Sequence, residues 1–201
     1  MNTIILGGFL GSGKTTALMQ FARFLAGISD ANKEYKIAIL ENEVGEIGID
    51  DQYLRSGGFS VKNLFAGCAC CTVAGELVVA AARIQREMDP EWLIIETTGI
   101  AYPALMRENL KNSLNLDSRI CILTDASRWK RLRVPLANLL RGQIEGCDAV
   151  LINKIDLVED ETLQSMESDI LEIEPKAPIV RISALGNVDG DIWRTAAGIS
   201  A

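Results

Sequence analysis

Residues 8–15 read Gly8-Phe9-Leu10-Gly11-Ser12-Gly13-Lys14-Thr15 and fit the pattern G-x-x-x-x-G-K-[ST] at every fixed position. An apolar run, residues 3–6, precedes this stretch, and a segment with helical spacing of apolar residues follows it. Glycines let a loop curl so that its N–H groups point at phosphate oxygens, and the following helix adds the positive end of its dipole. The sequence therefore predicts a phosphate-binding loop between a strand and a helix.

The side chains of this loop have distinct expected roles. Lys14 is expected to reach the β- and γ-phosphates of a nucleotide, and the Thr15 hydroxyl to bind Mg²⁺. The other expected nucleotide contacts in this stretch are Gly8, Gly11, Ser12, Gly13 and Thr16. A plain glycine-rich turn from strand to helix is the alternative, but it does not account for Lys-Thr at this place.

Short apolar runs recur along the rest of the chain with little alternation, and they indicate strands that are buried on both faces. The runs are 3–6, 37–40, 93–95, 120–123, 149–152 and 179–182. Between them, apolar residues recur at helical spacing in residues 18–25, 77–84 and 163–173. Alternation of strands and helices predicts an α/β, doubly wound fold. We expect a three-layer P-loop NTPase with a mostly parallel central sheet, and a single domain over residues 1–201.

Composition excludes several classes of protein. The 201 residues are 48% hydrophobic and 23% charged, as in soluble globular proteins. The net charge of −7 argues against nucleic acid as a partner, because phosphate contacts need a basic surface. No apolar run approaches the ~20 residues that span a bilayer, and no signal peptide is recognisable, so a cytoplasmic protein without a membrane partner is expected. The chain has no histidine, so metal binding would fall to carboxylates and thiolates.

The tetrapeptide Asn153-Lys154-Ile155-Asp156 follows the apolar run 149–152 and bears on the identity of the nucleotide. The Asp156 carboxylate can accept hydrogen bonds from the ring N–H and the exocyclic amine of guanine. Adenine does not present these two donors together, so the site favours GTP over ATP. The Lys154 stem is expected to lie over the base, and Asn153 to brace the loop.

The dipeptide Ser183-Ala184 comes just after the last apolar run. At that place, a backbone N–H can reach the oxygen of guanine. An ordinary connecting loop fits the same dipeptide nearly as well.

An acidic residue, Glu96, directly follows the apolar run 93–95. There, the Glu96 carboxylate would hold the hydration shell of Mg²⁺ or orient water, and the Gly99 N–H would contact the γ-phosphate. The alternative is an ordinary strand end at which Thr97 or Thr98 caps the next helix.

A cysteine cluster, Gly67-Cys68-Ala69-Cys70-Cys71, holds three of the five cysteines of the chain. Structural disulfides are rare in a reducing cytosol, and the close spacing strains most pairings within the cluster. Crowded thiolates favour a soft cation, and two or three sulfurs with a carboxylate or water would form a tetrahedral site for Zn²⁺ or Co²⁺. Small buried residues in a turn, or a redox-sensing thiol, are the alternatives. The remaining two, Cys121 and Cys147, are expected in the core.

An acidic segment, residues 41–51, lies between the second apolar run and the cysteine cluster. It contains five acidic residues and two glycines. It is either a solvated loop or a switch segment that arranges carboxylates around Mg²⁺ and the γ-phosphate.

Together, these segments resemble the CobW family of metalloenzyme-assembly P-loop GTPases. The matching segments are Gly7–Thr16, Glu41–Asp50, Gly67–Cys71, Glu96–Pro103 and Asn153–Asp156, in the same order along nearly the whole chain. The resemblance implies a Mg²⁺-dependent GTPase that is slow without a partner, with Lys14, Glu96 and Gly99 as catalytic residues. Its nucleotide state would control the binding and delivery of a transition metal.

The resemblance also implies which residues bind each metal ion. Mg²⁺ would be held by Thr15, Asp50 and Glu96. The delivered metal, Zn²⁺ or Co²⁺, would be bound by Cys68, Cys70 and Cys71, with Glu41 or Glu46. The implied protein partner is a client metalloprotein or a corrinoid enzyme, and a homodimer is a further possibility.

The sequence departs from the family pattern in two respects. Many members carry a C-terminal domain and His-rich stretches, whereas we expect this chain to end soon after a helix at 191–197, without a C-terminal domain. Tyr102 stands where an acid is usual in the family. Two other functions remain open at this point: an accessory protein for cobalamin or corrinoid enzymes, and a nucleotide-dependent regulatory switch without a metal.

Overall fold

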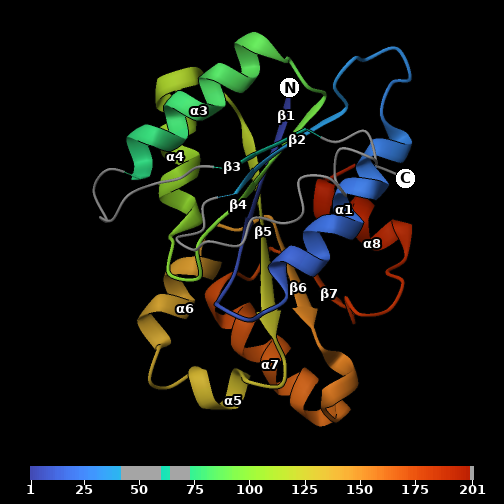
Figure 1. The fold of residues 1–201 in the computed structure, drawn as a ribbon. Helices are drawn as coiled ribbons and strands as arrows, with labels where there is room; N and C mark the ends of the chain where they lie inside the picture. The colour runs from blue at the N-terminus through green and yellow to red at the C-terminus, as the bar shows by residue number, and fades with distance from the viewer. Residues whose placement is uncertain (42–59, 64–72, 200–201) are drawn as a thin grey trace.

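A computed structural model describes residues 1–41, 60–63 and 73–199. Its core is a seven-stranded sheet with the order β3-β2-β4-β1-β5-β6-β7, in which every neighbouring pair is parallel (Figure 1). The strands are β1 (Asn2–Gly7), β2 (Ile37–Glu41), β3 (Ser60–Asn63), β4 (Trp92–Glu96), β5 (Ser118–Asp125), β6 (Ala149–Asn153) and β7 (Ile179–Arg181). The structure thus confirms the predicted α/β class and the six predicted strands.

The strand that the sequence did not predict is β3. Its four residues contain one apolar side chain, Val61, so no apolar run marks it. β3 lies at the edge of the sheet, where it pairs only with β2 among the described strands. An edge strand does not need to be apolar on both faces, and for that reason a search for continuous apolar runs misses it.

Helices cover both faces of the sheet and give the expected three layers (Figure 1). They are α1 (Lys14–Ile28), α3 (Val73–Glu87), α4 (Pro103–Leu114), α5 (Trp129–Leu132), α6 (Ala137–Ile144), α7 (Asp160–Ile173) and α8 (Gly190–Ala197), with a 3-10 turn, η1 (Ile155–Leu157). Within β1, Ile4 and Leu6 pack on α1 and α8, whereas Ile5 packs on the layer that contains α3, α4, α6 and α7. Successive strand residues point to opposite faces, so both sides of each central strand must be apolar.

The strand order gathers polar residues at one edge of the sheet. Because all seven strands are parallel, their carboxyl ends lie along the same edge. There, Glu41 of β2 is the register partner of Glu96 of β4, and Asp125 of β5 is the register partner of Asn153 of β6. In sheets of this kind, ligands bind beyond the carboxyl ends of the strands.

None of the described helices is both long and apolar enough to cross a membrane.

The two cysteines outside the cluster lie in the core, as predicted. Cys121 in β5 is fully buried, and Cys147, just before β6, is 6% exposed. Burial raises the pKa of each thiol from 9.0 to about 12, since an apolar environment disfavours the thiolate. Neither thiol is therefore nucleophilic near neutral pH.

We predict that these two thiols react only after unfolding. The test uses a variant in which the three cluster cysteines are changed to serine. At pH 8, less than one thiol per native protein should react with a chromogenic disulfide reagent. In the denatured protein, two thiols should react. Because the folded pKa values are raised, the thiols also stabilise the fold below about pH 9, and this contribution is lost as the pH rises toward 12. Rapid labelling of the native variant would contradict this prediction.

Candidate nucleotide-binding site

The loop between β1 and α1 has the backbone of a phosphate-binding loop. Gly8, Gly11 and Gly13 have φ angles of 139°, 76° and 93°. At Gly13, the N-cap of α1, a Cβ atom would also lie 2.5 Å from Asn153 Nδ2. This position therefore needs glycine both for its left-handed backbone and for its close contact with the end of β6.

The start of α1 is suited to an anion. Helix α1 has no side-chain N-cap and no acidic residue in its first turn, so its first N–H groups are not engaged by a carboxylate. Ser12 is fully buried, and its hydroxyl has no hydrogen-bond partner among the described residues. Lys14 is 5% exposed and its Nζ lies 3.4 Å from the Phe9 carbonyl oxygen. A buried hydroxyl and a buried ammonium beside the N-terminus of a helix fit a phosphate.

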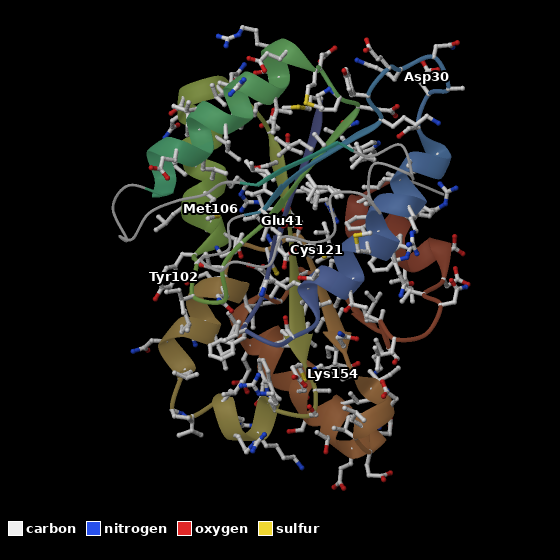
Figure 2. All side chains as sticks on the ribbon, viewed as in Figure 1. Asp30, Glu41, Tyr102, Met106, Cys121 and Lys154 are labelled. Atoms are coloured by element: carbon white, nitrogen blue, oxygen red, sulfur yellow. The ribbon has the colours of Figure 1, made fainter. Side chains whose placement is uncertain are left out.

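Thr15 and Glu96 meet between α1 and the end of β4. The Thr15 hydroxyl donates to Glu96 Oε1 at 3.1 Å, which joins two residues that are 81 positions apart. Glu96 is 2% exposed, and Glu41, its register partner on β2, is 8% exposed (Figure 2). A hydroxyl and two carboxylates at one sheet edge are the hard oxygen ligands that Mg²⁺ prefers, so this donor set fits that ion. Thr15 and Thr16 are both exposed residues in the first turn of α1, and no side-chain hydrogen bond of Thr16 to a described residue is observed.

The segment after β4 rests on the phosphate loop. The Thr97 N–H donates to the Leu6 carbonyl at 3.0 Å, so the chain leaves β4 alongside β1. At Gly99, a Cβ atom would lie 2.6 Å from the Leu10 nitrogen, and no larger residue would allow this approach. Gly99 is thus in contact with the loop that is expected to hold the phosphates.

Helix α6 supports this segment from the other side. Gln143 of α6, 2% exposed, donates from Nε2 to the Gly99 carbonyl at 2.9 Å. Tyr102, which replaces the acid usual in the family, lies against α6, where a Cβ atom on Gly142 would be 2.4 Å from its Cε1 (Figure 2). Tyr102 is therefore a packing residue in this structure, at the N-cap of α4.

The buried side chain of Asn153 joins three segments. Its Nδ2 donates to the Ser12 carbonyl at 2.8 Å, and its Oδ1 accepts from the Ala184 N–H at 2.8 Å. Asn153 is 3% exposed, so neither bond competes with water. This arrangement agrees with the bracing role expected from the sequence. The Ala184 N–H is engaged by Asn153, and the contact of a backbone N–H at Ser183-Ala184 with the guanine oxygen stays a prediction.

Lys154 is bound to the phosphate loop by a hydrogen bond and to the end of β5 by an ion pair (Figure 2). Its Nζ lies 2.7 Å from Asp125 Oδ2 and 2.7 Å from the Gly11 carbonyl oxygen. Asp125 is 5% exposed, and its other oxygen accepts from the N–H and the hydroxyl of Ser127. Lys154 therefore links the end of β6 to the loop before α1 and to the end of β5.

Asp156 remains available to a ligand. It is exposed in the turn η1, and its carboxylate makes no hydrogen bond or ion pair to another described residue. Ser183 lies in the loop after β7, next to Ala184. The structure thus brings the phosphate loop, residues 153–156 and residues 183–184 into one continuous set of contacts.

Two residues of this site were not found from the sequence. Asp125 is the last residue of β5, and a polar residue at the carboxyl end of a strand is the sequence signal that could have identified it. Gln143 lies in a short helix for which no periodic pattern was identified, and no local signal marks it.

Several expected site residues lie outside the described part of the chain. They are Glu46, Asp50, Cys68, Cys70 and Cys71. Within the described ranges, no group of three or more His, Cys, Asp or Glu residues is arranged to hold a metal ion.

Comparison with known proteins identifies the family. The family described as "CobW/HypB/UreG, nucleotide-binding domain" matches residues 2–181. The chain is 30% identical, over 88% of its length, to the "Zinc-regulated GTPase metalloprotein activator 1" of Dictyostelium discoideum, and covers 44% of that protein. It is 31% identical, over 82% of its length, to the "Zinc chaperone YeiR" of Escherichia coli, and covers 50% of it.

Solved structures show the same fold. The Zn(II)-bound YjiA GTPase from E. coli aligns over 100% of this chain and 63% of its own, with a TM-score of 0.61 and 25% identity. The hydrogenase maturation factor HypB of Archaeoglobus fulgidus aligns over 96% of this chain and 86% of its own, with a TM-score of 0.67 and 18% identity. The chain spans about half the length of the curated relatives above. It belongs to the CobW/HypB/UreG family of nucleotide-binding domains.

Proposed function

We propose that this protein is a Mg²⁺-dependent GTPase whose nucleotide state controls the binding and delivery of a transition metal. The observation that carries the proposal is the register at the carboxyl edge of the sheet. Asn63 of β3 is the register partner of Glu41, and Glu41 is the register partner of Glu96. Three neighbouring strand ends therefore connect the segment before the cysteine cluster, the acidic segment and the expected Mg²⁺ ligand.

Binding of GTP is supported by two sets of residues that meet at Asn153. The phosphate loop offers Lys14, the Ser12 hydroxyl and the first N–H groups of α1 to the phosphates. The base would lie beside Asp156, whose carboxylate accepts from the ring N–H and the exocyclic amine of guanine. Asn153 fixes the distance between these two sets through its bonds to Ser12 and Ala184.

Hydrolysis requires stabilisation of charge on the γ-phosphate. Lys14 would neutralise that charge, and the Gly99 N–H would contact a γ-phosphate oxygen. Thr15, Glu96 and Asp50 would hold Mg²⁺, which would supply positive charge to offset that of the phosphates. Glu96 would hold the ion or its water ligands. None of these residues is a strong general base, so turnover is expected to be slow without a partner.

Coupling to the metal follows from the position of Glu41. Cys68 follows Asn63 by five residues in the sequence, and Glu41 opens the acidic segment that includes Glu46. Loss of the γ-phosphate would change the contacts of Gly99 and Glu96, and Glu41 would pass this change to the thiolate ligands. By linkage, the metal must then alter the affinity for GTP by the same factor. The names of the relatives, zinc chaperones among them, favour Zn²⁺ over Co²⁺ as the cargo.

The guanine assignment is tested by Asp156→Asn. An amide cannot accept from both donors of guanine, but its own N–H₂ can donate to the carbonyl at position 2 of xanthine. We expect about 100-fold weaker GDP binding and a switch of preference to xanthosine diphosphate, since two charge-assisted bonds are lost. Isothermal titration with both nucleotides measures this, with Asp191→Asn on the exposed side of α8 as the control. Unchanged GDP affinity would refute the assignment.

The role of Glu96 is tested by Glu96→Gln. The amide keeps the size of the side chain and its bond to Thr15, but loses the charge that would attract Mg²⁺. We expect the Mg²⁺ concentration for half-maximal GTP hydrolysis to rise by about 10- to 100-fold. A lower maximal rate with the same Mg²⁺ dependence would assign Glu96 to water rather than to the ion.

The coupling is tested by Zn²⁺ binding in the presence of GDP and of a non-hydrolysable GTP analogue. We expect Zn²⁺ affinities that differ by at least about fivefold between the two nucleotides. Cys70→Ser should weaken Zn²⁺ binding, and Glu41→Gln should reduce the difference between nucleotides. Glu172→Gln, on the exposed side of α7, is the matched control. Equal Zn²⁺ affinities with both nucleotides would refute the coupling.

A further inference from the structure

Gln20 is a residue of α1 that the proposed GTPase reaction does not use directly. Its amide makes three hydrogen bonds to the backbone of the loop that follows β7. Nε2 donates to the Ala184 carbonyl at 2.7 Å and to the Gly186 carbonyl at 2.8 Å, and Oε1 accepts from the Val188 N–H at 3.1 Å. One side chain thus determines the path of residues 184–188.

The same loop is held from a second direction. Asn153 accepts from the Ala184 N–H, so the peptide groups on both sides of the Ala184 Cα are bound by side chains, one from β6 and one from α1. Ala184 and Val188 are themselves buried against α1 in the core. Leu185, between them, is 87% exposed, and its N–H bonds to no other described residue. The loop therefore has fixed ends, and the N–H at its tip has no partner among the described residues.

The chemistry of this contact is specific to a primary amide. The two carbonyls require two N–H donors, and the Val188 N–H requires an acceptor. A glutamate of the same length would place an anionic oxygen against two carbonyl oxygens. A leucine of similar volume would leave all three backbone groups without a hydrogen-bond partner. Each of these groups that is partly buried would then reduce the stability of the loop.

We propose that Gln20 is a positioning residue for guanine recognition, which holds the 184–188 loop so that its backbone faces the oxygen at position 6 of the base. This inference rests on the proposed binding of GTP, in which Asp156 takes the opposite, N–H edge of the same ring. Gln20 is six residues, or about 9 Å along the helix, from Lys14. The helix that starts at the phosphates therefore also sets the position of the loop at the base.

The alternative is that Gln20 only stabilises the loop, without regard to the base. The two roles differ in which nucleotides are affected. A positioning residue changes affinity only for bases that carry an oxygen at position 6. A purely structural residue changes the affinity for all purine nucleotides together.

The experiment measures binding of GDP, ADP and 2-aminopurine riboside diphosphate to the wild type, Gln20→Leu and Gln20→Glu. 2-Aminopurine lacks both that oxygen and the ring N–H at position 1 but keeps the exocyclic amine. We expect GDP to dissociate at least about tenfold faster from both variants, while the affinity for 2-aminopurine riboside diphosphate changes less than twofold. The control is Gln85→Leu, an exposed glutamine on α3, which should behave as the wild type. Thermal unfolding identifies folded variants, and either substitution at Gln20 suffices for the comparison.

The possible results separate this inference from the proposed function. A wild type that does not prefer GDP to ADP would refute guanine binding, and the inference with it. A wild type that prefers GDP, with equal losses for GDP and 2-aminopurine riboside diphosphate in the Gln20 variants, would refute the inference alone. Unchanged GDP dissociation in both variants would refute it as well.

Discussion

The amide of Asn153 is the contact on which the rest of the site depends. It is buried, and it bonds to the Ser12 carbonyl on one side and to the Ala184 N–H on the other. It joins the 8–15 loop directly to the 183–188 loop, which α1 also contacts through Gln20. Because these two bonds are shielded from water, their loss would leave two buried backbone groups without partners. A single amide therefore joins the 8–15 loop, the end of β6 and the loop after β7.

The parallel sheet makes this contact possible. Asn153 ends β6, and Asp125, its register partner, ends β5 and binds Lys154. On the other side of β1, Glu96 and Glu41 end β4 and β2 in register with each other. Strands of one direction bring all these residues to a single edge, although they are distributed over more than 110 positions of the sequence. The proposed guanine and metal sites would thus lie along one row of strand ends.

Helices α1 and α6 each contact loops at this edge of the sheet. α1 carries Lys14 at its start and Gln20 two turns later, so it touches both the phosphate loop and the 184–188 loop. α6 holds the Gly99 carbonyl through Gln143, and it packs against Tyr102, where the family usually has an acid. At position 102, the tyrosine ring packs against α6 where a carboxylate would otherwise stand. The segment after β4 is therefore held by its contacts with α6.

The sequence by itself determined the fold class, six strands and the phosphate loop, because continuous apolar runs and the spacing of Gly8, Gly13 and Lys14 are local patterns with a direct physical meaning. It also placed Asn153 in a bracing role. It did not identify β3, whose edge position removes the need for an apolar run, nor Gln20, Asp125 and Gln143. Only the tertiary structure decided those roles, because a polar side chain gains its function from backbone groups that are distant in sequence and close in space.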